Sequence, residues 1–155
     1  MYPYNRMLID IETLPIVSGR HEFLRIRSEV DICIFLSPTR AKTRTLKALW
    51  DTGATNTSIL MELAIKMGIP LRKETVMQLG TITQPSRYCS FYLRFSDKHY
   101  VFIRDGVAVH GSRNKLVIGM GLMRLGTTIV TVNRQNGVRF TFEINETEFQ
   151  NGVLQ

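Results

Sequence analysis

The sequence has few of the residues on which many small proteins depend for cross-links or metal sites. It contains 2 cysteines and 3 histidines in 155 residues. Cys33 and Cys89 lie far apart in apolar segments, which excludes a dense disulfide framework or a cysteine-rich zinc site, and we expect both to be reduced packing residues. His21-Glu22 begins like a zinc-protease helix but lacks the second histidine. We therefore expect no metal and no cofactor.

Long hydrophobic runs are also missing. The segment Val30–Leu36 is interrupted by Asp31 and is far shorter than the roughly 20 residues that a membrane-spanning helix needs. The first six residues do not have the charged, apolar and small-residue order of a secretory signal. We therefore expect a cytoplasmic protein that does not enter a membrane.

Acidic residues are the scarcer charged class, with 13 Asp and Glu against 20 Lys and Arg, a net charge of +7. The densest basic segment, Arg40–Arg44, follows Ser37-Pro38 and is expected in a hairpin loop. A basic chain can bind nucleic acid through phosphate contacts, so a basic β-rich nucleic-acid-binding domain is one alternative. It is disfavoured, because Phe91 and Phe95 fit a core better than an exposed stacking platform.

The hydrophobic pattern predicts one mainly β domain. A hydrophobic content of 44% supplies a core for a chain of this length. An i, i+3, i+4, i+7 pattern within 58–67, on Leu60, Leu63, Ala64 and Met67, predicts a short helix that ends at Gly68. A second short helix is expected over 120–124. The predicted strands span 30–36, 43–50, 75–82, 87–95, 99–104, 107–110, 116–118, 127–132 and 138–144.

The sequence also predicts two turns and the two faces of one strand. Asp105-Gly106 predicts a hairpin turn between two short strands, and Asn133–Gly137 predicts another. In the segment 89–95, apolar residues alternate with Ser90, Tyr92 and Arg94, which predicts one buried and one wetter face.

The same pattern predicts how the chain is divided into an arm, a domain and a tail. We expect residues 1–28 to form an amino-terminal arm or an extra strand, 29–145 to form the domain, and 146–155 to form a polar tail.

One group of residues has the side chains that a catalytic site would need. An acid, a hydroxyl and a glycine directly follow an apolar strand, and a strand can hold a carboxylate rigidly. The glycine lets backbone amides approach, and the hydroxyl can satisfy polar groups in a dry setting. A second apolar strand that ends in glycine comes later. The residues are Asp51, Thr52, Gly53 and Ala54, with Thr57 downstream, and then Val117, Ile118 and Gly119.

This group of residues resembles the retropepsin family, the retrovirus-type aspartic proteases and their cellular and bacterial relatives. The resemblance covers roughly residues 30–144 and implies a mainly β, retropepsin-like fold with the active site at a homodimer two-fold axis. It implies Asp51 as the catalytic residue and Thr52, Gly53, Ala54 and Thr57 as its support. It implies a substrate-binding flap at Leu79, Gly80, Thr81, Ile82 and Thr83, and a segment that packs beside the catalytic loop at Val117, Ile118 and Gly119.

The function implied by this resemblance is an aspartic endopeptidase that acts on a polypeptide substrate. Only one such Asp motif occurs, so the second carboxylate must come from the other subunit of a homodimer. Two Asp51 side chains would then share one proton and activate water. The chain departs from the family at Gly121, where relatives often carry a polar residue, and it has a single glycine at the flap tip.

Three other interpretations use the same residues. The retropepsin-like fold could serve as a dimerisation or peptide-binding module with little turnover. Asp51–Thr57 also resembles the phosphate-binding hairpin of sugar kinases and actin-like ATPases, but the second phosphate loop of those longer proteins is missing. Finally, Asp51 could simply cap a turn at the end of a strand.

Overall fold

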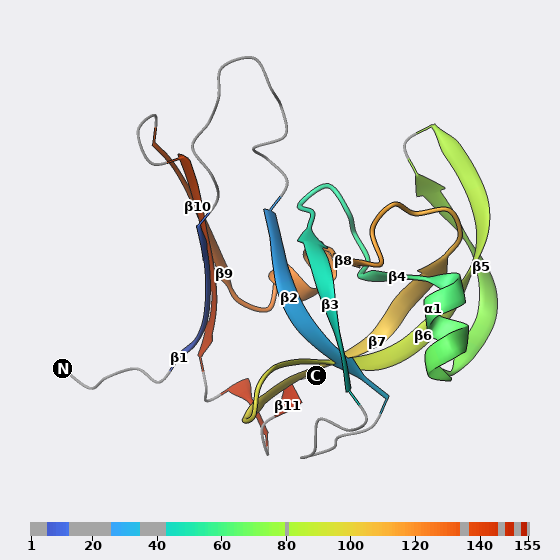
Figure 1. The fold of residues 1–155 in the computed structure, drawn as a ribbon, viewed down its shortest axis with the longest axis horizontal. Helices are drawn as coiled ribbons and strands as arrows, with labels where there is room; N and C mark the ends of the chain where they lie inside the picture. Colours follow the sequence, from blue (N-terminus) through green and yellow to red (C-terminus); the bar gives the residue numbers. More distant parts are fainter. Residues whose placement is uncertain are drawn as a thin grey trace.

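The computed structural model describes residues 6–12, 26–34, 43–79, 81–133, 137–145, 148–150 and 153–154. These parts of the chain form strands and two short helices (Figure 1). Within them, neither helix has the length and apolar character needed to cross a membrane.

The larger sheet contains eight of the strands. They are β2 (Ile26–Cys33), β3 (Thr43–Trp50), β4 (Ser58–Leu60), β5 (Leu71–Leu79), β6 (Ile82–Ser96), β7 (His99–Val109), β8 (Leu116–Ile118) and β11 (Val153–Leu154). Their order is β11-β7-β4-β8-β3-β2-β6-β5, and β6 also pairs with β7. This extra pairing makes the sheet curl back on itself. The parallel pair β3 and β8 lies in the middle of the sheet, and Asp51 directly follows β3.

The smaller sheet has the order β1-β10-β9 and stands beside the larger one in Figure 1. Its strands are β1 (Arg6–Glu12), β9 (Thr127–Asn133) and β10 (Gly137–Asn145). Trp50 joins the two sheets, because its ring centroid lies 5.2 Å from those of both Phe140 and Phe142. Its indole N–H also donates to the Ser28 hydroxyl at 2.8 Å. The residue before Asp51 is therefore fixed on both sides.

The first helix, α1 (Met61–Met67), is amphipathic as predicted: Leu63 and Ala64 are buried, and Ile65 is exposed. It ends at Gly68, which has a φ of 73° and lies in the left-handed region that favours glycine. The predicted helix begins too early, because Ser58–Leu60 pair with β7 and β8 as the short strand β4.

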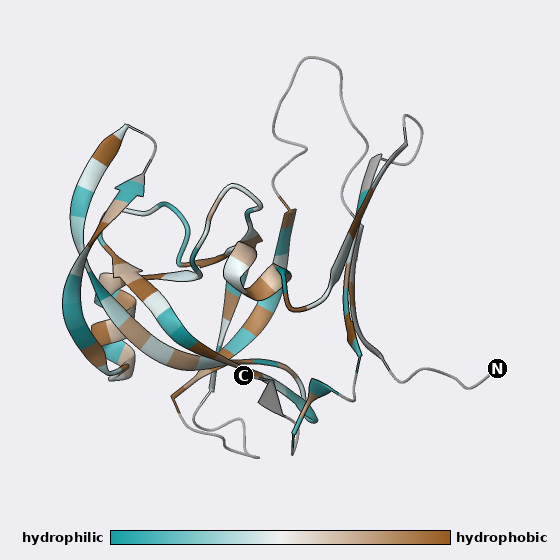
Figure 2. Cartoon of the chain, turned by 180° about the vertical axis from the view of Figure 1, so that it is seen from behind, coloured by the Kyte–Doolittle hydropathy of each residue, from teal (hydrophilic) through white to brown (hydrophobic). Residues whose placement is uncertain are grey.

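The strand patterns predicted from period-two alternation are largely confirmed. Hydrophobic and hydrophilic residues alternate along the strands in Figure 2. Predicted strands at 43–50, 116–118, 127–132 and 138–144 correspond to β3, β8, β9 and β10, and the predicted helix at 120–124 corresponds to α2 (Met120–Met123). The turn after Leu36, most of Arg40–Arg44 and the residues 134–136 lie outside the described residues.

The interpretation of Asp105-Gly106 as a hairpin turn is wrong. Both residues lie inside β7, which runs continuously to Val109. The pairing of β6 with β7 shifts register in this region, so the pair marks a β-bulge instead. A Cβ on Gly106 would lie 2.7 Å from the ring of Phe91, so packing against β6 requires glycine there.

The wetter face predicted for 89–95 is wrong at one residue. Cys89, Phe91 and Leu93 are fully buried, as predicted, but Arg94 on the opposite face is only 5% exposed. Its guanidinium lies 5.7 Å from the centroid of the Tyr100 ring and binds the Asp97 carboxylate. An arginine can cover apolar surface with its stem while its charged group is paired, which alternation alone does not reveal.

The remaining sequence-based expectations concern the cysteines and the chain ends. Cys33 and Cys89 are both buried as free thiols. The strand β1 lies within the predicted amino-terminal arm and pairs with β10 along its length. The division into arm, domain and tail stays a prediction.

Candidate functional site

Asp51 is held by backbone hydrogen bonds immediately after β3. Its N–H donates to the Ile118 carbonyl at 2.9 Å, and its own carbonyl accepts the N–H of Ala54 at 3.2 Å. Its Oδ1 accepts the backbone N–H of Gly53 at 2.9 Å. The side chain is half-buried. One carboxylate per chain is thus fixed in a tight turn, with part of its surface open to a reactant.

Gly53 and Thr52, which follow Asp51, differ in what their surroundings require of the side chain. A Cβ on Gly53 would lie 3.2 Å from Asp51 Oδ1, so a side chain there would crowd the carboxylate. Thr52 is exposed, and its hydroxyl has no hydrogen-bond partner among the residues that the structure describes. This hydroxyl is therefore available to a second molecule.

The short helix α2 braces the far end of this loop. The Met120 N–H donates to the Ala54 carbonyl at 2.7 Å, and the Gly121 N–H donates to the Thr55 carbonyl at 2.8 Å. A Cβ on Gly121 would lie 3.1 Å from that Thr55 oxygen, which is a tight contact. The glycine at which the chain departs from the family pattern thus lies where backbone approaches backbone.

Thr57 and Gly119 form a buried connection between the loop and the end of β8. Thr57 is 4% exposed, and its hydroxyl accepts the Gly119 N–H at 3.3 Å. A Cβ on Gly119 would lie 2.5 Å from the Asn56 carbonyl oxygen and 2.8 Å from that of Ala54. The two segments approach so closely that only glycine fits.

The predicted flap lies on the hairpin of β5 and β6. Gln78 pairs with Thr83, and Leu79 pairs with Ile82. Thr81, Ile82 and Thr83 are exposed, whereas Gly80 lies outside the described residues. Figures 1 and 2 show the hairpin tip at the same end of the molecule as the loop that follows β3. No described contact joins Asp51 to the hairpin tip.

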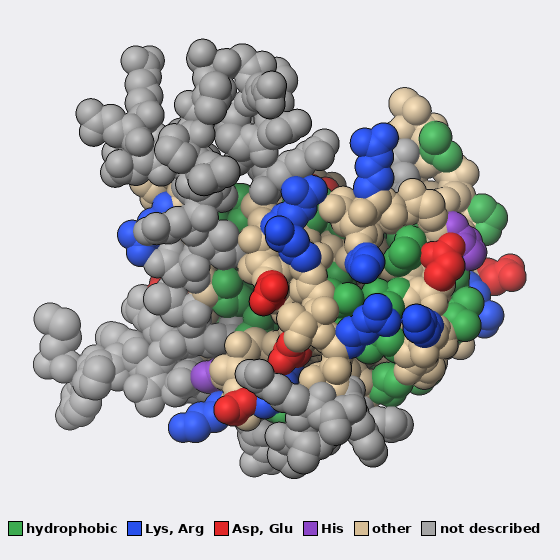
Figure 3. All heavy atoms as spheres, in the orientation of Figure 1, with side chains coloured by type: hydrophobic (Ala, Val, Ile, Leu, Met, Phe, Trp, Pro, Cys, Tyr) green, Lys and Arg blue, Asp and Glu red, His purple; other side chains and the backbone are tan. Residues whose placement is uncertain are grey.

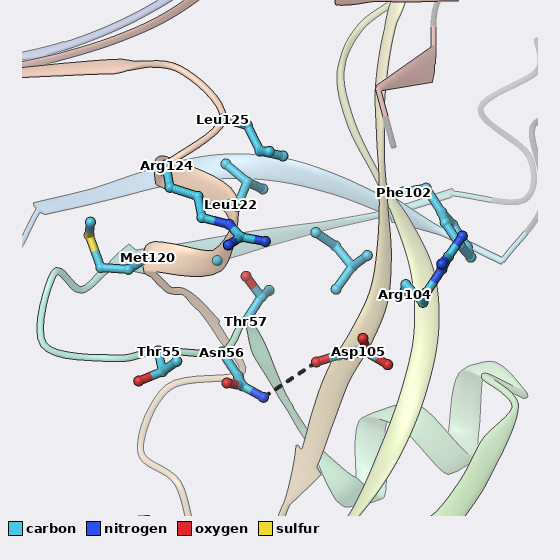
Figure 4. A pocket seen from close by; sticks show the side chains of 12 residues that line it. Thr55, Asn56, Thr57, Phe102, Arg104, Asp105, Met120, Leu122, Arg124 and Leu125 are labelled. Carbon is cyan, nitrogen blue, oxygen red and sulfur yellow. Dashed lines mark hydrogen bonds between the residues drawn. The ribbon is translucent and has the colours of Figure 1, made fainter.

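A hollow of about 710 Å³ opens behind the loop. Figure 4 shows it between α2, the segment Thr55–Thr57 and β7. The Asn56 amide donates across it to the Asp105 carbonyl at 3.5 Å. Asp51 does not line this hollow, so a ligand there would not contact the candidate catalytic carboxylate.

The structure brings most of the predicted site together around one loop. Asp51, Ala54 and Thr57 contact Ile118, Gly119 or α2 by the hydrogen bonds above. The sequence interpretation missed Thr55 and Met120, whose backbone groups join the loop to α2. It also missed Asn56, whose side-chain amide donates to the Asp105 carbonyl. The only local signal was the position of these residues next to motif residues. Among the described residues, no three His, Cys, Asp or Glu side chains lie close enough to hold a metal.

Comparison with known proteins rests on the fold. No family model and no curated protein sequence matches the chain. The structure is similar to that of a retropepsin-like aspartic protease from Rickettsia conorii, with a TM-score of 0.55 and 12% identity over 93% of this chain and 97% of that one. The retroviral protease-like domain of Ddi1 from Leishmania major aligns with a TM-score of 0.44 and 15% identity over 74% of this chain and 93% of that domain. On the first of these similarities, this chain has the retropepsin-like fold.

Proposed function

We propose that the chain is an aspartic endopeptidase that works as a homodimer with one Asp51 from each subunit. The observation that carries the proposal is the fixed carboxylate of Asp51 in a loop braced by Ile118, Gly119 and α2. Catalytic groups need this kind of preorganised support. The retropepsin-like fold is consistent with the chemistry, although the fold by itself does not imply it.

The dimer follows from the chemistry of peptide hydrolysis. The reaction needs a base to take a proton from water and an acid to protonate the carbonyl oxygen. The loop provides a single carboxylate in each chain, and a two-fold axis beside Asp51 would supply the second. The exposed, unpartnered hydroxyl of Thr52 supports this, because it can hydrogen-bond to the facing subunit.

In the proposed mechanism, the two facing carboxylates share one proton, because like charges so close cannot both be ionised. The ionised Asp51 takes a proton from water, and the water oxygen attacks the carbonyl carbon of the peptide bond. The protonated Asp51 donates to the carbonyl oxygen. When the tetrahedral intermediate collapses, the C–N bond breaks and the leaving nitrogen accepts a proton from the dyad.

The hairpin of β5 and β6 offers a way to hold the peptide. Its tip carries exposed Thr81, Ile82 and Thr83, and Val76 and Ile82 are 66% and 67% exposed. We propose that an extended substrate pairs with this hairpin as an added strand and covers these apolar side chains.

The strand β9 offers a surface for the second copy. In the three-stranded sheet it has β10 on one side and no described strand on the other. Its side chains Ile129 and Val130 are 49% and 48% exposed. An exposed edge rich in β-branched residues favours pairing with another strand, and this supports association of two copies through β9.

The test is cleavage of a peptide library from mildly acidic to neutral pH, with Asp51→Asn as the matched control. The proposal predicts cleavage by the native protein, loss of cleavage in the variant, and inhibition by pepstatin-type compounds. A protein that is dimeric at the assay concentration and cuts no peptide would contradict it. That result would favour a peptide-binding module on the same fold.

A further inference from the structure

A second hollow lies on the exposed face of the larger sheet. Its volume is about 340 Å³, and we call it the basic hollow. Four exposed cationic side chains line it: Arg27 on β2, Lys47 on β3, and Arg113 and Lys115 in the loop before β8. Thr45, Leu46 and Asn114 complete the lining. Figure 3 shows Lys and Arg side chains, with some Asp and Glu side chains among them, over the middle of this view, where Figure 1 places β2 and β3.

These four cations form no ion pair within the described residues. None of them makes a side-chain hydrogen bond with a described residue either. Two acidic residues lie on the exposed face of β2. Glu29 is the strand partner of Lys47, but their side chains form no ion pair. The Asp31 carboxylate accepts the Thr45 hydroxyl at 2.6 Å. Positive charge remains in excess, and an anionic ligand would relieve its repulsion.

The loop that carries Arg113 and Lys115 is fixed from several directions. The His110 carbonyl before it accepts the Gln84 side-chain amide at 2.9 Å. Within the loop, the Ser112 hydroxyl bonds both the N–H and the carbonyl of Asn114, at 3.2 and 2.9 Å. The Lys115 carbonyl accepts the Leu60 N–H at 3.0 Å. The two cations are therefore presented by a constrained backbone, which lowers the entropy cost of binding.

The basic hollow lies on the same side of β3 as Asp51. Leu46, Ala48 and Trp50 are buried, so the alternate residues Lys47 and Asp51 project to the opposite, accessible side. The two residues are four positions apart along the strand, which is about 13 Å. An extended peptide that places its scissile bond at Asp51 and follows the direction of β3 would bring a side chain three or four residues away to the hollow.

Because of this placement, we infer that the basic hollow selects polypeptides that carry a Glu or Asp three or four residues from the cleaved bond. The inference rests on the proposed function for the position of that bond. An acidic peptide is favoured over single-stranded nucleic acid, because no aromatic side chain lines the hollow and such nucleic-acid sites use aromatic stacking.

Binding can be measured apart from catalysis with the full-length Asp51→Asn protein. Two fluorescent peptides share an apolar centre and differ only in having Glu or Gln at the third and fourth positions on either side of it. Fluorescence polarisation is expected to show tighter binding of the Glu peptide, with a preference that shrinks as salt is raised. Lys47→Glu/Arg113→Glu should weaken binding of the Glu peptide by about fivefold to tenfold. The control Lys98→Glu changes an exposed lysine in the β6–β7 turn and should leave the preference intact.

Equal binding of the two peptides, or an equal loss in Lys98→Glu, would overturn the inference. So would displacement of the Glu peptide by a single-stranded oligonucleotide at a lower concentration than by unlabelled Glu peptide. Cleavage by the native protein separates the two proposals. If the native protein cleaves peptides without a preference for Glu, only the selective role of the hollow is refuted. If it cleaves no peptide but still binds the Glu peptide more tightly, only the proposed protease activity is refuted.

Discussion

The hydroxyl of Thr57 accepts the backbone N–H of Gly119 across 62 positions of sequence, in a site where Thr57 is 4% exposed. Beside it, the Asp51 N–H donates to the carbonyl of Ile118. Two short segments that are distant in sequence thus hold the loop of the candidate catalytic carboxylate. If these contacts fix the position of the carboxylate, changing them should affect both stability and activity.

Thr57→Val should lower the free energy of unfolding by about 1–3 kcal/mol, because the buried Gly119 N–H would lose its acceptor. Thr57→Ser keeps the hydroxyl and is the matched control. Urea denaturation of both variants measures the difference. Equal midpoints for the two variants would show that the hydrogen bond contributes nothing.

Gly119→Ala should be more damaging than Gly121→Ala. The added Cβ would lie 2.5 Å from the Asn56 carbonyl oxygen in the first case and 3.1 Å from the Thr55 carbonyl oxygen in the second. Backbone must therefore move for Gly119→Ala, at a cost of about 1–3 kcal/mol in the free energy of unfolding. Thermal unfolding and peptide cleavage measure the two effects. The prediction fails if Gly121→Ala is the less stable of the two.

The buried thiol of Cys89 should make the protein less stable at alkaline pH. Burial raises the pKa of Cys89 from 9.0 to about 12, although the Arg72 charge lowers it in part. Between these pH values the unfolded state has lost the thiol proton and the folded state retains it. The free energy of unfolding therefore falls as pH rises from about 9 to 12, by up to about 1.4 kcal/mol per pH unit from this group.

Other groups titrate in the same range, so the measurement compares the native protein with Cys89→Ala. Urea denaturation at successive pH values should give a shallower decline for the variant. Parallel curves would contradict a buried thiol with a raised pKa. Burial also raises the pKa of Cys33, so part of the decline should persist in Cys89→Ala.

Ile129→Lys should weaken the proposed association through β9. A lysine on the exposed edge strand would place like charges opposite each other when two copies pair. Sedimentation equilibrium should show a higher dissociation constant for the variant. The matched control is Ile65→Lys, which changes a similarly exposed isoleucine on α1. If both variants associate like the native protein, β9 is not the interface.

The sequence predicts the local parts of this structure better than its non-local parts. Period-two alternation predicts β3 and part of β6, and the helical pattern predicts α1 and its end at Gly68, because these depend on neighbours in the chain. The start of α1 was misplaced, since β4 forms only where β7 and β8 lie beside it. No local pattern contains that information.

The same reason explains the errors at Asp105-Gly106 and Arg94. An Asp-Gly pair favours a turn locally, but a register shift against β6 turns it into a bulge within a strand. Arg94 belongs to the polar set of its strand, and its burial depends on Tyr100 of the neighbouring strand. In the site, the Asp51 motif is visible in sequence, whereas the backbone bonds from Met120 and Gly121 depend on how closely α2 approaches.

Mixing active and inactive subunits tests the central claim most directly. Native protein is combined with increasing amounts of Asp51→Asn protein under conditions where subunits exchange, and cleavage is measured per native subunit. If each active site needs Asp51 from both subunits, an equal mixture should show about half the activity per native subunit, because half of the partners are inactive. Activity per native subunit that stays constant across all mixtures would contradict a shared site and show that one chain suffices.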